Sequence, residues 1–206
     1  MTKFLKQGVW AVLLIFVIHL AAVVPQAGEI KGTVTAAGGS AAKNAAVWVG
    51  AIPGKTFTPP AKHAIVDQNH LKFIPHVLVI LKGTTVEFLN SEPTLHNVFW
   101  PWIGGNKKLA DNLGTRPMGQ KLSFTFNNLG VVPLLCNVHT EMSGYIVVVS
   151  TPYFAVAGPD GSFDIKGVPP GHYTLKFWSE QGTKVDSQAV DVVATGATTV
   201  NPNYRR

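Results

Sequence analysis

The stretch Leu135-Cys136-Asn137-Val138-His139-Thr140-Glu141-Met142 holds the only cysteine of the 206-residue chain. It begins at the end of one apolar run, Val131–Cys136, and comes just before another, Tyr145–Val149; the β-branched residues of both runs predict strands. A histidine follows the cysteine at the third position, and a methionine comes three positions later. One short loop therefore carries a thiol, an imidazole and a thioether. A second imidazole, His96, comes earlier in the chain, after another predicted strand and a Ser-Glu-Pro turn.

These donors match the set that holds copper in electron-transfer sites. Two imidazoles and a thiolate in a trigonal arrangement, with a weak axial thioether, form a type 1 copper centre. Thiolate and imidazole suit both oxidation states, so a ligand set fixed in advance moves little when an electron enters or leaves. His96, Cys136, His139 and Met142 are therefore the predicted ligands of one copper ion that alternates between Cu(II) and Cu(I).

Two other interpretations of this loop stay open. A lone cysteine is often an inert buried hydrophobic residue, although the spacing C-x₂-H-x₂-M after a strand-end histidine argues against coincidence. Zinc also binds cysteine together with two histidines, and it would need a harder fourth ligand than Met142. Glu141 is the nearby carboxylate that could supply it.

The remainder of the chain predicts an all-β protein. Short runs of β-branched and aromatic residues recur between Gly, Pro, Asn and Asp turn signals. A helical turn or two is expected only within Lys107–Leu113. Besides the two strands beside the cysteine, the predicted strands are Ile30–Val34, Ala46–Ile52, Val77–Leu81, Val86–Leu89, Leu122–Phe126, Phe163–Ile165 and Tyr173–Trp178.

The N-terminal residues 1–27 have the layout of a secretory signal peptide. Lys3 and Lys6 precede an apolar run, Val9–Val24, which is short for a membrane span of about 20 residues. We expect cleavage near Ala27, a periplasmic or secreted mature protein, and no stable membrane insertion after cleavage. Loss of the two lysines lowers the formal charge of +6 by two. The remaining basic residues are scattered apart from Lys107–Lys108 and Arg205–Arg206 and form no basic stripe, so nucleic-acid binding is not expected.

The strand number exceeds that of one sandwich of about 100 residues. Composition changes at the Pro/Lys/Thr-rich connector Pro53–Lys62 and again near Ser150–Pro152. The segments 28–62 and 151–206 are too short for independent domains. We therefore expect them to pair with each other as one β-sandwich, into which a central domain, residues 63–150, is inserted.

Residues 64–149 resemble the cupredoxins, the small blue copper proteins with a Greek-key β-sandwich. The stretches that carry the resemblance are Phe73-Ile74-Pro75, Gly83 to Asn90, His96-Asn97-Val98, and Cys136 to Met142 leading into Tyr145–Val149. The short ligand loop is similar to that of the amicyanins. The resemblance implies that His96, Cys136 and His139 are equatorial ligands and Met142 the axial one. It also implies that Asn97 ties the two ligand loops together by hydrogen bonds.

The two flanks resemble a carboxypeptidase regulatory-like, or transthyretin-like, β-sandwich. The opening is Ile30–Val34 with Ala45–Val49, and the close is Asp160–Ile165 with Val168–Leu175. The pattern D-G-x-F-x-I…P-G-x-Y-x-L alternates turns and strands and carries no catalytic chemistry. Its inward-facing residues are expected to be Phe163, Ile165, Tyr173 and Leu175.

The sequence predicts an exported electron carrier and not an enzyme. It has no G-x-S-x-G, H-E-x-x-H or Gly-rich phosphate motif, and its leftover histidines form no second copper set. The expected partner is a redox protein, a cytochrome or a dehydrogenase, with the solvent edge of His139 as the electron exit. Two alternatives stay open: a copper-holding or delivery protein, and an adhesion or carbohydrate-contacting module with structural copper.

Several other residues invite a role. Phe99 is expected in the core, while Trp100 and Trp102 could lie in the core or on an apolar rim around the metal. Met118 could approach the metal from a neighbouring loop. Lys107 and Lys108 are expected on a solvated loop. The histidines expected outside the site are His63, His70, His76 and His172.

Overall fold

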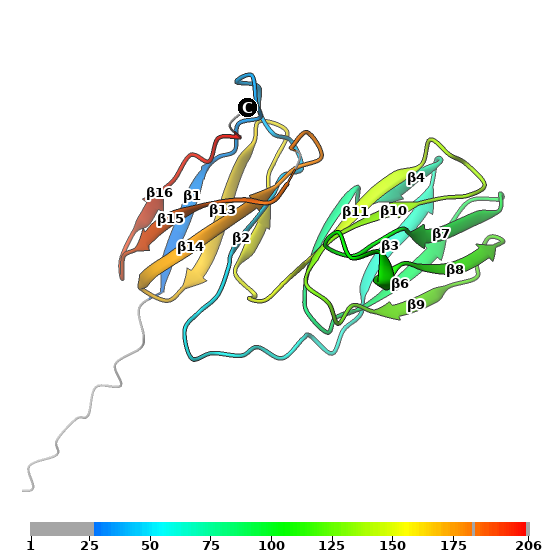
Figure 1. Cartoon of the computed structure of the whole chain (residues 1–206), viewed down its shortest axis with the longest axis horizontal. Coiled ribbons are helices and arrows are strands. Elements are labelled where there is room, and N and C mark those ends of the chain that lie inside the picture. The colour runs from blue at the N-terminus through cyan, green and yellow to red at the C-terminus, as the bar shows by residue number, and fades with distance from the viewer. Residues whose placement is uncertain (1–26, 183, 205–206) are drawn as a thin grey trace, which may run out of the picture.

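The chain forms two β-sandwiches that lie next to each other (Figure 1). The computed structural model describes residues 27–182 and 184–204, so the predicted signal peptide lies outside the described residues apart from Ala27. The all-β fold class is confirmed, because the regular structure of these residues consists of strands and one short 3₁₀ turn, η1 (Lys107–Leu109). Within the described residues no helix has the length and apolar character needed to cross a membrane.

The outer sandwich joins the two ends of the described chain. Its sheets have the strand orders β13-β1-β16 and β12-β2-β14-β15. β1 runs antiparallel to β13, and β2 runs antiparallel to both β12 and β14. The segment before the central block therefore pairs directly with the segment after it. The strands are β1 (Gly28–Thr33), β2 (Ala46–Val49), β12 (Phe154–Val156), β13 (Ser162–Val168), β14 (Gly171–Trp178), β15 (Asp186–Val192) and β16 (Ala197–Thr199).

The inserted sandwich contains the ligand loop. Its sheets have the orders β5-β11-β10-β7-β8 and β4-β3-β6-β9. The pairs β5–β11 and β3–β6 are parallel, and the other pairs are antiparallel. The strands are β3 (Ala64–Asn69), β4 (Lys72–Ile74), β5 (Val77–Leu81), β6 (Thr85–Asn90), β7 (His96–Trp100), β8 (Asp111–Arg116), β9 (Leu122–Thr125), β10 (Gly130–Leu135) and β11 (Ser143–Val149).

Burial patterns explain which faces of the strands meet. β6 alternates buried and half-buried residues, with Val86 and Phe88 facing the core of the inserted sandwich. β2 is buried at every position. This continuous burial arises because the second face of β2 is covered too: Trp48 packs in one cluster with Val79 and Val147 of the inserted sandwich. Strands covered on both faces lose the alternation that marks a half-exposed strand.

The register of β7 corrects one expectation about the core. A strand presents every second residue to the same face. Since His96 faces inward with no exposed surface, Val98 and Trp100 face inward as well. Phe99, which we expected in the core, is only half-buried. Trp100 fills the core instead, with its ring centroid 4.8 Å from that of Phe124 and 5.3 Å from that of Phe126.

All nine predicted strands are present, with small shifts at their ends. The helical expectation at Lys107–Leu113 was too long, because η1 ends at Leu109 and β8 begins at Asp111. The strands that the sequence did not predict are short, or carry polar residues that weaken the apolar signal. They are β3, β4, β7, β8, β12, β15 and β16.

We expect Trp100→Ala to lower the free energy of unfolding of the inserted sandwich by about 3–5 kcal/mol, the usual cost of emptying a large aromatic site in a core. The substitution also leaves the Leu109 carbonyl without the indole N–H that it accepts at 3.0 Å. Denaturant unfolding measures the change. Leu129→Ala, at a half-exposed position, is the control, and an equal loss in both variants would contradict this packing.

Candidate metal centre

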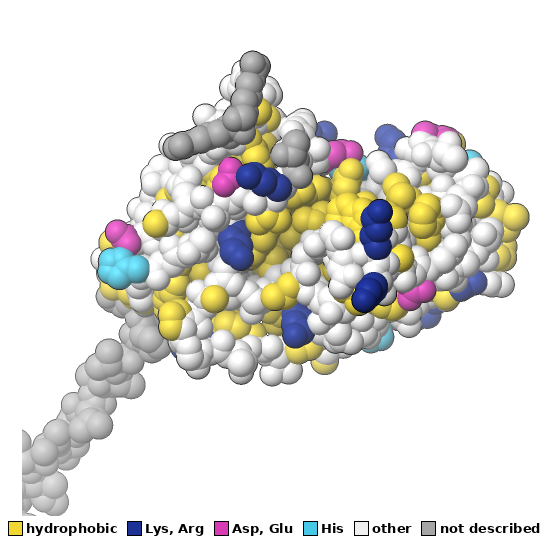
Figure 2. Space-filling view, in the orientation of Figure 1, with side chains coloured by type: hydrophobic (Ala, Val, Ile, Leu, Met, Phe, Trp, Pro, Cys, Tyr) yellow, Lys and Arg dark blue, Asp and Glu magenta, His cyan; other side chains and the backbone are white. Residues whose placement is uncertain are grey.

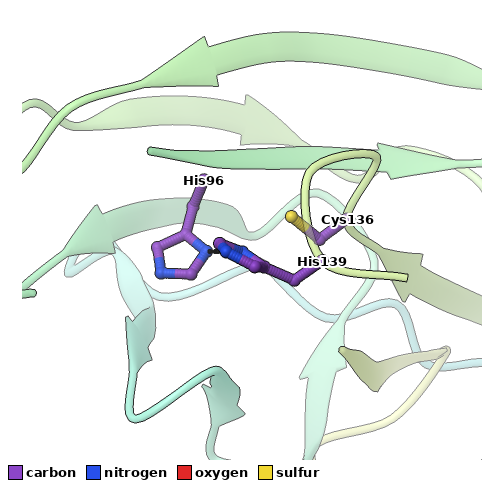
Figure 3. Close-up of side chains that lie close together, drawn as sticks. All are labelled: His96, Cys136 and His139. Carbon is purple, nitrogen blue, oxygen red and sulfur yellow. Dashed lines mark hydrogen bonds between the residues drawn. The ribbon is translucent and has the colours of Figure 1, made fainter. Parts of the chain in front are cut away.

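Two neighbouring strands bring the distant donors together at one end of a sheet. His96 is the first residue of β7, and Cys136 follows the last residue of β10. These strands run antiparallel, with Leu135 opposite Phe99. The end of β10 therefore lies beside β7, and the loop that leads into β11 returns to the same place with His139 (Figure 3).

The three donor groups converge on one small space. The ligand atoms of His96, Cys136 and His139 all lie within 4.8 Å of one another. The two imidazoles face each other, with their Nδ1 atoms 3.2 Å apart (Figure 3). His96 and Cys136 are buried, and His139 is half-buried. A thiol and two imidazole nitrogens that point into one space suit a soft or borderline metal such as copper.

Met142 is the last residue of the ligand loop before β11, and its side chain is buried. Its side chain is 1% exposed and belongs to the same apolar cluster as Cys136. Its backbone N–H donates to the His139 carbonyl at 3.0 Å, which makes the end of the loop a tight turn. A thioether is thus held in the core at the end of the ligand loop. Glu141, the carboxylate considered for zinc, is exposed.

Asn97 connects the two segments that carry the donors. Its backbone N–H donates to the Cys136 sulfur at 3.4 Å. Its side-chain oxygen accepts the Asn137 backbone N–H at 3.4 Å, and its side-chain nitrogen donates to Asn112 at 2.9 Å. The side chain of Gln68 donates to the Asn97 carbonyl at 3.1 Å. Each of these bonds restrains the ligands through a neighbouring polar group, an arrangement that orients metal ligands.

Glu92 is a site residue that the sequence analysis missed. Its Oε1 lies 2.6 Å from Nε2 of His96, the ring nitrogen on the side away from the donor cluster. The carboxylate also accepts the backbone N–H groups of Leu71 and His70, each at 3.0 Å. The Leu71 N–H above all lowers the pKa of Glu92, with His96 and the His70 N–H adding to the effect. The only sequence signal for this contact is the four-residue separation from His96.

The remaining candidates lie outside the donor cluster, the only group of its kind in the described part of the chain. His63 pairs with Glu87, His76 with Glu180, and His172 with Asp191. His70 is exposed in the β3–β4 turn. Met118 is 56% exposed, and Lys107 and Lys108 are exposed as expected. Trp102 is half-buried and packs against the apolar cluster of Trp48, Val79 and Val147 between the two sandwiches.

Fold and donor set together define a β-sandwich protein that carries a candidate metal centre within its described residues. The family described as "Copper binding proteins, plastocyanin/azurin family" matches residues 61–149. Amicyanin from Paracoccus versutus is 30% identical over 90 residues, which are 43% of this chain and 67% of that protein. The chain belongs to the plastocyanin/azurin family of copper-binding proteins, the cupredoxins.

A second family description and several solved structures also match. "Polysaccharide lyase family 4, domain II" matches residues 138–200, which contain most of the C-terminal part of the outer sandwich. A reduced amicyanin mutant is 24% identical, with a TM-score of 0.39 over 50% of this chain and 97% of its own. The Cu(I) form of another amicyanin mutant is 28% identical, with a TM-score of 0.39 over 42% of this chain and 81% of its own.

We expect Asn97→Ala to lower the free energy of unfolding of the metal-free protein by about 1–3 kcal/mol, because it removes two part-buried hydrogen bonds, one with the Asn137 N–H and one with Asn112. The control is Asn137→Ala, since Asn137 is exposed and contributes its backbone N–H to this network. Thermal or denaturant unfolding measures both variants. A tether role for Asn97 is wrong if the two variants are equally stable.

Proposed function

We propose that this protein is an exported type 1 copper protein that carries single electrons between redox partners. The observation that carries the proposal is the convergence of His96, Cys136 and His139 within 4.8 Å in a cupredoxin domain. These three residues, together with Met142 as a weaker fourth ligand, would hold the copper ion. Copper, when bound, supplies a centre that accepts and releases one electron between Cu(II) and Cu(I).

The protein's own contribution is to hold the ligands in place before and after the electron moves. His96, Cys136 and Met142 are buried, so water has little access to the donors from the core side. Asn97 donates to the sulfur and restrains the loop. A ligand set that is packed and hydrogen-bonded in advance needs little rearrangement, which favours fast one-electron exchange.

His139 is the proposed exit for the electron. It is the one half-buried member of the donor cluster. The residues next to the two histidines in the chain, Leu95 and Val138, are 52% and 44% exposed. Exposed apolar side chains beside a site favour docking of a partner surface. We propose that a cytochrome or a dehydrogenase docks there.

Export is the second part of the proposal. The N-terminal part of the chain resembles a signal peptide, because Lys3 and Lys6 precede the apolar run Val9–Val24. The single cysteine fits an oxidising compartment when a metal occupies its thiolate, because the thiol is then protected from oxidation and mispairing. We propose that the mature protein acts in the periplasm or outside the cell, as a carrier and not as an enzyme.

The first prediction of this proposal is spectroscopic. With added Cu(II), the mature protein is expected to show a strong thiolate-to-copper absorption band and narrow copper hyperfine splitting in its EPR spectrum. Cys136→Ser is expected to lose both features, because the serine hydroxyl cannot replace the cysteine thiolate as a copper ligand. A colourless protein, or an ordinary tetragonal Cu(II) spectrum that the variant leaves unchanged, would contradict the proposal.

A charge placed at Val138, next to His139, tests whether the electron leaves through His139. We expect Val138→Glu to slow electron self-exchange by about tenfold or more, because two like charges oppose each other when the same faces meet. Its absorption spectrum should keep the copper band. The control is Leu129→Glu, an exposed position just before β10 and so at the opposite end of that strand from Cys136. Equal slowing in both variants would exclude this exit.

A second candidate function is a carbohydrate-contacting module with structural copper. The match of residues 138–200 to a polysaccharide lyase domain supports it. So does a groove of about 550 Å³ between the two sandwiches, lined by Trp48, Trp102 and Trp178 with Lys176 and Lys184. Figure 2 shows hydrophobic side chains gathered between the sandwiches with lysines and arginines around them. Binding of an acidic polysaccharide, which the two lysines would attract, and its retention by Cys136→Ala would favour this candidate.

The copper-holding alternative differs from electron transfer in its outcome. A delivery protein would pass copper to an acceptor without reversible reduction and oxidation of the bound ion.

We also propose that the outer sandwich is similar to carboxypeptidase regulatory-like domains. Its inward-facing residues pack into one core, with Phe163, Ile165 and Leu175 buried and Tyr173 partly buried.

A further inference from the structure

We infer that Glu92 is a positioning residue that fixes the tautomer of His96 and lowers the reduction potential of the copper centre. The inference rests on the proposed function, since it concerns the same site. It assigns a role to a residue outside the four ligands, through the hydrogen bond between Glu92 Oε1 and His96 Nε2 at 2.6 Å.

The contact determines which ring nitrogen is free for a metal. An ionised carboxylate only accepts hydrogen bonds, so Nε2 of His96 must carry the proton. Nδ1 is then left with its lone pair, and it is Nδ1 that faces the ring of His139 at 3.2 Å. His96 has no exposed surface, so solvent does not compete for either nitrogen. The imidazole is therefore presented in its metal-binding form before any metal arrives.

Glu92 is itself held in place from two directions. Its carboxylate accepts the backbone N–H groups of His70 and Leu71, which are aimed at it by a turn in which both residues have positive φ, 54° and 55°. Its own backbone N–H donates to the side chain of Asn90 at 3.1 Å. The side chain of Asn90 donates in turn to the Thr94 carbonyl at 2.7 Å. The positioning residue is thus fixed to the loop that carries His96.

The negative charge has a consequence for the two oxidation states. A carboxylate on the far nitrogen makes the imidazole a stronger electron donor, as in carboxylate–histidine–metal arrangements. A stronger donor and a nearby negative charge stabilise Cu(II) more than Cu(I), because Cu(II) carries one more positive charge. The side chain of Glu92 is 16% exposed, so water screens this charge only in part.

Glu92→Gln in the copper-loaded full chain tests this inference. The amide has the same shape and can still accept a bond from Nε2, but it removes the charge. We expect the blue absorption to persist and the ratio of Cu(II) to Cu(I) affinity to fall about tenfold, which corresponds to a potential about 59 mV higher. The matched control is Glu141→Gln, which removes an exposed charge from the ligand loop and should leave the potential close to that of the wild type.

Nitrogen-15 NMR of the metal-free wild type provides a second test that needs no variant and no copper. A proton on Nε2 of His96 is expected, together with a strongly hydrogen-bonded proton resonance. A proton on Nδ1 would overturn the inference, as would an unchanged potential in a blue Glu92→Gln protein. A wild type that never becomes blue would contradict the proposed function instead, and the NMR result would still decide the role of Glu92.

Discussion

The metal centre depends on the antiparallel contact between β7 and β10. This contact places the end of β10 beside β7, with Leu135 opposite Phe99, and the backbone N–H of Asn97 donates to the sulfur of Cys136 at 3.4 Å. A shift of β7 by one residue would turn His96 to the opposite face, because side chains alternate along a strand. The same shift would remove Trp100 from the core. The core and the ligand set are thus fixed by one register.

The polar groups around the donors form a connected set in a largely apolar surrounding. Asn97 restrains the cysteine segment, and Glu92 restrains the histidine at the other side. Both depend on backbone N–H groups from separate parts of the chain, Asn137 in one case and the His70–Leu71 turn in the other. The buried members, His96 and Asn97, are both paired, and paired polar groups in an apolar surrounding are rigid. Such rigidity suits a centre whose ligands should not move when the charge changes.

The outer sandwich packs against a face of the inserted domain that includes none of the four predicted ligands. Trp48 and Trp178 pack against Val79 and Val147, which belong to the paired strands β5 and β11. Glu180 adds a polar contact by pairing with His76 and accepting the hydroxyl of Tyr145. Burial and the charge of Glu180 raise the pKa of Tyr145 to about 12, so the hydroxyl keeps its proton. The contact between the two sandwiches therefore does not involve Leu95 and Val138, the exposed residues next to His96 and His139 in the chain.

The sequence by itself determined the strand-rich fold class, the ligand loop and the distant histidine, because these depend on residue type and local spacing. Cys136, His139 and Met142 lie within one short segment, so their proximity follows from chain length alone. Only the tertiary structure decided that Glu92 bonds His96, that Trp100 and not Phe99 fills the core, and that Trp48 and Trp178 join the two sandwiches. Each of these depends on strand register or on the direction of backbone N–H groups far away in the chain, and local patterns carry no information about either.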